Sequence, residues 1–172
     1  MVQALKTKRI VIGAMIGALY VVLTVTQSLL FPGSTSQAIQ FRASEALMML
    51  ALFSPTAIYG LTVGCCIANV FGGMPIDIII GSFATLLTCI SIYKTRTVTL
   101  KDFPILSLMF PALCNGIIVG AEIQLFYIGG FNWISFLTQA AFVAIGELTV
   151  SVLLGIPLYY SILKTNLHKF LK

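Results

Sequence analysis

The sequence predicts an all-α integral membrane protein, a bundle of six transmembrane helices with its N- and C-termini in the cytoplasm. Of its 172 residues, 59% are hydrophobic and only 9% are charged, and the mean hydropathy is +1.04. Such values are typical of membrane proteins rather than soluble ones. Proline, glycine and short polar stretches divide the chain into apolar runs, most of them long enough to cross a bilayer. We expect one membrane domain over residues 1–172.

The first helix is expected over residues 10–31, between a basic N-terminal stretch and Pro32. A basic stretch before an apolar run also occurs in signal peptides, whose hydrophobic part is about 7–15 residues long. At 1.5 Å per residue the run in this chain would be roughly 33 Å long, which is enough to span a bilayer. We therefore expect a retained helix.

The second helix is expected over residues 38–53, beginning at about Ala38 or Arg42. From Arg42 to Phe53 an α-helix would rise only about 18 Å. Residues 37–40 are therefore expected to enter the membrane region. Irregular backbone is tolerated at that depth where it is buried in protein or lines a cavity, so we expect a cavity near the outer end of this helix.

Four further helices are expected, over residues 55–71, 75–93, 104–127 and 133–163. Ser54 is expected to cap the third helix, with Pro55 at its first helical position. Pro55 could instead kink one long helix that joins the second and third, which would leave five spans.

The basic residues distinguish six spans from five. With six spans and a cytoplasmic N-terminus, nine of the ten basic residues lie on one side: Lys6, Lys8, Arg9, Lys94, Arg96, Lys101, Lys164, Lys169 and Lys172. Only Arg42 then lies outside. With five spans, six of those nine would face outward, against the tendency of Lys and Arg to lie on the cytoplasmic side. Six spans is therefore the prediction.

Polar residues within the apolar runs indicate a binding site, because a charge inside the membrane is costly and is usually kept for function. Arg42 and Glu45 are three residues apart and would share one face of a helix. Four of the five acidic residues converge on the outer half of the bundle, and the fifth, Asp102, falls in the cytoplasmic loop. The sequence predicts an outward-facing acidic pocket lined by Arg42, Glu45, Asn69, Asp77, Asn115, Glu122, Gln139 and Glu147.

Structural roles also fit several of these residues. Asp77 would stabilise the N-terminus of a helix, and Arg42 would anchor at the headgroups or pair with Glu45. Asn69 and Asn115 would hydrogen bond between helices.

Glu122 and Glu147 favour a functional role, because a carboxylate within the membrane needs a cation, a donor-rich ligand or a proton. The chain contains no G-x-x-x-x-G-K-[ST], H-E-x-x-H or G-x-S-x-G motif and no C-x-x-C spacing, and its single histidine, His168, lies near the C-terminus. The basic residues form clusters between apolar runs rather than a nucleic-acid-binding face. We expect binding rather than catalysis, with no metal, cofactor or nucleic acid.

Small residues four apart recur in the first helix. Gly13 and Gly17 form one such pair, and Ala14 and Ala18 form a second. This spacing lets another helix approach closely.

Several motifs spread along the chain carry a resemblance to a known family. They are Ala14-x-x-x-Ala18, Gln40-Phe41-Arg42-x-Ser44-Glu45-Ala46-Leu47, Gly60-Leu61-x-x-Gly64-Cys65-x-x-Ala68-Asn69, Asp77-Ile78-Ile79-x-Gly81-Ser82, Asn115-Gly116, Gly120-Ala121-Glu122 and Gly146-Glu147. With six short apolar helices and a basic cytoplasmic rim, the chain resembles the substrate-binding (S) subunits of energy-coupling factor (ECF) transporters. Within that group it resembles the QueT family.

The resemblance implies a multi-pass protein of the cell membrane that is not an enzyme. Such a subunit would capture a queuosine precursor, a 7-deazaguanine such as preQ1, and would topple in the membrane to deliver it. Its partners would be a transmembrane coupling subunit, which Ala14 and Ala18 would face, and two ABC ATPases.

The expected ligand suits an acidic pocket. A 7-aminomethyl-7-deazaguanine offers adjacent N–H donors on a guanine-like edge and a protonated amine, and both suit carboxylates. Three alternatives remain open at this stage. The chain could be an S subunit for another vitamin such as thiamine, or a proton- or cation-coupled secondary transporter in which Glu122 and Glu147 titrate. It could also be a scaffold whose carboxylates only hold helices together.

Overall fold

The computed structural model describes residues 2–34, 41–72, 75–100 and 103–171, and this part of the chain is helical, without β-strands. Its elements follow the order α1 (Val2–Leu30), η1 (Ala43–Leu52), α2 (Pro55–Gly72), α3 (Pro75–Thr95), α4 (Ile105–Glu122), η2 (Ile123–Gly129), α5 (Trp133–Val150), η3 (Ser151–Gly155), α6 (Ile156–Lys164) and α7 (Leu167–Leu171). The all-α prediction is confirmed.

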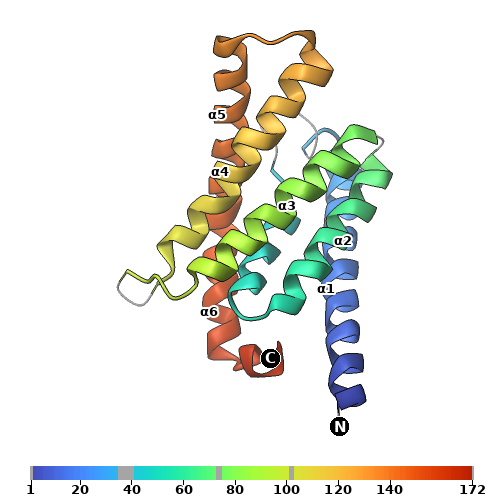
Figure 1. Cartoon of the computed structure of the whole chain (residues 1–172), viewed down its shortest axis with the longest axis vertical. Coiled ribbons are helices and arrows are strands. Elements are labelled where there is room, and N and C mark those ends of the chain that lie inside the picture. Colours follow the sequence, from blue (N-terminus) through green and yellow to red (C-terminus); the bar gives the residue numbers. More distant parts are fainter. Residues whose placement is uncertain (1, 35–40, 73–74, 101–102, 172) are drawn as a thin grey trace.

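The long helices surround η1. In Figure 1, α1 and α2 lie on one side of the bundle, α4 and α5 on the other, and α3 runs obliquely across the front. Both chain ends lie at the lower end of the view. The central η1 contacts every helix from α1 to α6, so it forms the middle of the core.

Five helical stretches in the described part of the chain are long and apolar enough to cross a membrane, by length and composition. They are Gln3–Leu30, Pro55–Gly72, Pro75–Thr95, Ile105–Gly129 and Trp133–Lys164. The sixth apolar helix, η1, has only 10 residues. An α-helix needs about 20 residues to span a bilayer, so length alone does not make η1 a full span.

The second helix differs most from its expected form. Residues 38–40 lie outside the described part, and the helix that follows is a 3₁₀ helix of 10 residues rather than an α-helix. A 3₁₀ helix rises about 2.0 Å per residue, so these residues reach about 20 Å, against about 15 Å for an α-helix. Residues 44–52 are all buried. The greater rise per residue of the 3₁₀ helix therefore lets this short segment reach deep into the core.

The other boundaries differ where polar or irregular turns continue a helix. Helix α1 begins at Val2 rather than at residue 10, because the basic N-terminal residues continue the helix beyond the apolar run. The π-helical turn η2 prolongs the expected fifth helix beyond α4, and the π-helical turn η3 interrupts the expected sixth helix between α5 and α6. A short last helix, Leu167–Leu171, was not expected. The start of α2 at Pro55, after Ser54, agrees with the prediction, and Thr56 N–H donates to Ser54 Oγ at 3.2 Å.

Glycines bring α1 and α2 into close contact. A Cβ on Gly17 would lie 2.9 Å from Gly60 O, and a Cβ on Gly64 would lie 2.8 Å from Gly17 O. A Cβ on Gly60 would lie 2.5 Å from Gly13 O, so the backbone of Gly13 also lies close to α2. The Gly13/Gly17 pair is thus used inside this chain, which leaves the neighbouring Ala14 and Ala18 exposed.

Small residues also bring α4 and α5 into close contact. A Cβ on Gly120 would lie 2.8 Å from the Cα of Ala140, and one on Gly116 would lie 3.2 Å from the Cβ of Ala144. Helices in membranes associate through such close packing of small residues, because lipid provides no hydrophobic driving force between them.

Gly60→Ala should destabilise the protein, because its Cβ would lie 2.5 Å from Gly13 O and must push α1 away. Overpacking of this kind costs about 1–3 kcal/mol. The measurement is thermal unfolding of the purified protein in detergent. Gly72→Ala is the matched control on the same helix, since a Cβ there meets nothing within 4 Å. Equal melting temperatures for the two variants would contradict the close α1–α2 contact.

Candidate binding site

An ion pair joins the start of η1 to the start of α3. Arg42 Nη2 lies 2.8 Å from Asp77 Oδ2, and both side chains are almost completely buried. Arg42 Nη1 also donates to Asn69 Oδ1 at 3.2 Å, and Asn69 Nδ2 donates to the backbone oxygen of Asp77 at 2.8 Å. Arg42, just before η1, and the side chains of Asn69 in α2 and Asp77 in α3 form one hydrogen-bonded cluster, which we call the rim cluster.

A cavity of about 260 Å³ opens beside the rim cluster. Arg42, Asn69 and Asp77 line it, together with Thr24 and Ser28 of α1. The cavity lies where the sequence predicted one, at the beginning of the second helix. The approach over residues 37–40 lies outside the described part of the chain.

Arg42 does not form the suggested pair with Glu45. It precedes η1 with an extended backbone (φ −97°, ψ 102°), and its guanidinium is bound to Asp77 and Asn69. Glu45, one 3₁₀ turn further, accepts a hydrogen bond from the hydroxyl of Tyr20, which is 0% exposed. The helical spacing of Arg42 and Glu45 did not predict these partners, because Arg42 lies before the helix begins.

Further polar side chains lie on the same side of α1 as Tyr20. They were not predicted as part of the site. Thr24 Oγ1 donates to Ser44 Oγ at 2.7 Å. Gln27 Oε1 accepts from the backbone N–H of Ala43 at 2.8 Å. Tyr20, Thr24 and Gln27 recur with helical spacing in a largely apolar helix, and this stripe is the signal that could have identified them.

A second pair lies deeper, between α4 and α5. Asn115 Nδ2 donates to Glu147 Oε1 at 2.7 Å, and both residues are buried. The other oxygen of Glu147 has no hydrogen-bond partner in the described part of the chain. Glu45 lies on η1, which packs against both α4 and α5. The structure thus brings Glu45, Asn115 and Glu147 into one region.

Glu122 is the most isolated of the acidic side chains. It is 2% exposed, and neither carboxylate oxygen has a hydrogen-bond partner among the described residues. The charges of Asp77 and Arg42 act on it from the rim cluster. Burying a carboxylate without partners is costly, so this group is suited to a ligand that supplies donors.

The last predicted residue is not brought into these groups. Gln139 is half-buried on α5 and has no hydrogen bond to the other seven predicted residues. Gln124, which was not predicted, is buried in η2 and donates to Gly130 O at 2.7 Å. Its burial depends on the π-helical turn, for which the sequence carries no clear signal. Asp102 lies outside the described residues, and the described part contains no group of three metal-ligating side chains.

Gly81 leaves room for the rim cluster. A Cβ at this position would collide with Asp77 Oδ1 and would lie 3.0 Å from Asn69 Nδ2. Glycine one turn after Asp77 is therefore needed where this carboxylate and amide meet.

The five long apolar helices in the described part of the chain define a multi-pass membrane protein. The model of the QueT transporter family matches residues 10–164, and the chain belongs to this family.

One relative is the protein called "Queuosine precursor transporter QueT" from Lactococcus lactis subsp. cremoris (strain MG1363). It is 41% identical over 81 residues, which cover 47% of this chain and 47% of the relative. The matched region thus spans about half the length of the relative. The comparison with solved structures gives no match.

Neutralising one partner of the ion pair should destabilise the protein more than neutralising both. Arg42→Gln or Asp77→Asn leaves a buried charge without its partner, and each should cost about 3 kcal/mol. The double variant should lose less than the sum, and a double-mutant cycle of unfolding free energies in detergent measures this coupling. Additive losses would mean that the two groups do not interact.

Proposed function

We propose that this chain is the substrate-binding subunit of an ECF-type ABC importer. It would capture a queuosine precursor, a 7-deazaguanine such as preQ1, and deliver it inward with an ATP-driven coupling module. The observation that carries the proposal is Glu122, a buried carboxylate whose two oxygens lack partners in the described part of the chain. Family membership and the name of the Lactococcus relative support this class of ligand.

Glu122 and Glu147 are the carboxylates that we assign to the ligand. Glu147 has one oxygen bound by Asn115 and one without a partner, and Glu122 has two without partners. Asp77 is already paired with Arg42, so it would mainly shape the site. Glu45 accepts from Tyr20 with one oxygen, and its other oxygen, like that of Glu147, has no partner in the described part of the chain, so Glu45 could also accept from the ligand. One free carboxylate would accept the adjacent N–H donors of the guanine-like edge, and the other would bind the ammonium group.

Arg42, Asn69, Asp77, Asn115 and Gln139 complete the proposed site. The cavity of about 260 Å³ is slightly smaller than the usual ligand pocket of about 300–1,000 Å³. We propose that this cavity is the entrance and that the ligand binds between it and the deeper carboxylates.

We further propose that η1 makes the sixth pass, with both termini cytoplasmic. Both chain ends lie at the same end of the bundle in Figure 1, as an even number of passes requires. The basic residues of α1 and α6 belong to that end, in agreement with the positive-inside tendency.

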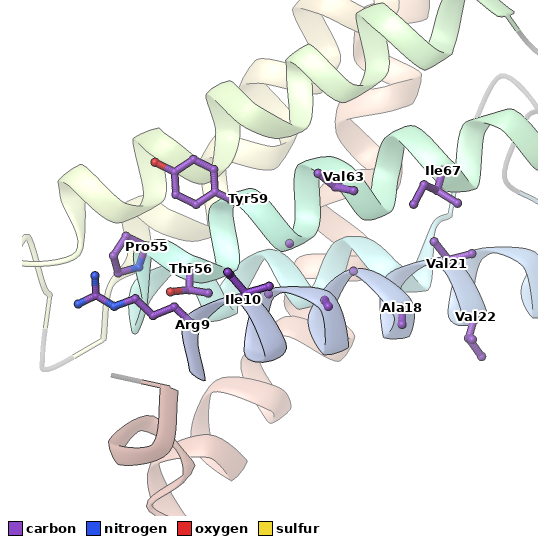
Figure 2. A pocket seen from close by; sticks show the side chains of 14 residues that line it. Arg9, Ile10, Ala18, Val21, Val22, Pro55, Thr56, Tyr59, Val63 and Ile67 are labelled. Atoms are coloured by element: carbon purple, nitrogen blue, oxygen red, sulfur yellow. The ribbon is translucent and has the colours of Figure 1, made fainter. Parts of the chain in front are cut away.

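The contact with the coupling subunit is assigned to the outer face of α1. Ala14 and Ala18 are exposed and line a groove between α1 and α2 (Figure 2). Their small side chains would let a partner helix approach closely. The two ABC ATPases would supply the ATP hydrolysis for which this chain has no P-loop motif.

Glu122→Gln and Glu147→Gln should each weaken binding of 7-aminomethyl-7-deazaguanine at least tenfold, since a charge-assisted hydrogen bond contributes about 1.5–3 kcal/mol. Titration of the purified protein in detergent measures this affinity, with the cyano analogue, queuine, guanine and thiamine as competitors. Asp102→Asn is the matched control, because it makes the same chemical change in the polar segment between two helices.

The stability of the ligand-free variants separates binding from a structural role. Glu122→Gln should be at least as stable as the wild type, because it removes an unpartnered buried charge. Lower stability with wild-type affinity would instead assign Glu122 to holding helices together.

Ala14→Leu/Ala18→Leu should retain ligand binding and lose most ATP-dependent uptake, because the larger side chains keep the coupling subunit away. Uptake is measured in proteoliposomes that contain the complete importer. Ala141→Leu is the control, since Ala141 is exposed on α5, away from the groove. Uptake by this chain alone, without ATP, would contradict the importer proposal and favour a secondary transporter.

A further inference from the structure

A basic cavity lies at the end of the bundle that holds the chain termini. Its volume is about 380 Å³, and Arg9 of α1, Arg96 after α3 and His168 of α7 line it. The beginning of α2, at Ser54, Pro55 and Thr56, forms another wall. Elements far apart in the sequence thus bring two guanidinium groups and an imidazole to one cavity.

The arginines of this cavity are not neutralised within the described part of the chain. Neither Arg9 nor Arg96 takes part in a salt bridge there, and no carboxylate lines the cavity. The Arg96 guanidinium lies over the Tyr93 ring, 3.7 Å from its centroid, and donates to Tyr93 O. This stacking holds the guanidinium in place, so the cavity is suited to an anion.

An apolar groove continues from the basic cavity. Arg9, Pro55 and Thr56 line both, and the groove of about 900 Å³ extends between α1 and α2 as far as Val22 and Ile67. Figure 2 shows Arg9 beside Pro55 and Thr56 at one end, with Tyr59 and aliphatic side chains along the rest. From Arg9 to Val22 the groove follows α1 for about 20 Å, and one leaflet of the hydrocarbon core is about 15 Å thick.

We propose that this continuous site binds one anionic phospholipid, with its phosphate in the basic cavity and an acyl chain in the groove. The charge of the cavity, the apolar lining of the groove and their meeting at Arg9 together match the two parts of such a lipid. A free phosphate would use only the cavity. Arginine provides planar, bidentate recognition of phosphate, and basic residues at the membrane surface attract anionic lipids.

The lipid would occupy the surface that contains Ala14 and Ala18. It must therefore leave before another helix packs there. The lipid site itself does not depend on the identity of the transported substrate.

The test is native mass spectrometry of the full-length protein, released from a mild detergent after incubation with dioleoyl phosphatidylglycerol or dioleoyl phosphatidylcholine. Wild-type protein should retain phosphatidylglycerol at least tenfold more strongly than phosphatidylcholine. Arg9→Gln/Arg96→Gln should remove this preference. Ala18→Phe, which fills the groove and leaves both arginines, should lower retention of phosphatidylglycerol at least fivefold.

Lys6→Gln/Lys164→Gln is the matched control, because it removes the same charge from residues that line neither the cavity nor the groove. It should keep the lipid preference. Equal retention of the two lipids by the wild type, or an equal loss in this control, would overturn the proposal. Competition by glycerol 3-phosphate at the concentration of the lipid would also overturn it, since the cavity would then be a site for free phosphate.

Discussion

The Arg42–Asp77 ion pair is the interaction on which the arrangement of the polar residues depends. Either charge alone would be costly in a site where the side chains are only 11% and 7% exposed. Because Arg42 precedes η1 and Asp77 lies in the first turn of α3, the pair determines where the central helix begins. One 3₁₀ turn further, Glu45 then meets Tyr20, and the rest of η1 passes into the core.

The all-helical fold was predictable, because prolines, glycines and polar stretches divide the chain into apolar runs. The predicted count of six spans is not confirmed, since five helical stretches in the described part are long and apolar enough to cross a membrane. The type of helix in the second element could not be predicted from the sequence. Apart from Ser44 and Glu45, residues 43–52 are apolar, so their pattern does not distinguish an α-helix from a 3₁₀ helix. The π-helical turns η2 and η3 could not be predicted from the sequence either, since such turns are not specified by local residue preferences alone.

For the candidate site, the residue types were predictable and their partners were not. An ionisable group in an apolar run is visible in the sequence, which is why Glu122 and Glu147 were identified. The pairing of Arg42 with Asp77 depends on two helix starts that are distant in sequence. Tyr20 was missed because a tyrosine within an apolar helix is ordinary. Gln139 was included for its polarity, which says nothing of the direction in which its side chain points.

The unpartnered oxygens of Glu122 and Glu147 give a physical reason for selectivity. Without ligand, these buried oxygens find no donor among the described residues to offset their desolvation. A ligand with several N–H donors and a positive charge removes this penalty, so part of its binding energy is relief of a cost already present in the empty protein. An anionic or purely apolar solute of similar size would leave the carboxylates unsatisfied and add repulsion or further desolvation. The proposed site would therefore discriminate by the donors that a ligand supplies, and shape alone would not suffice.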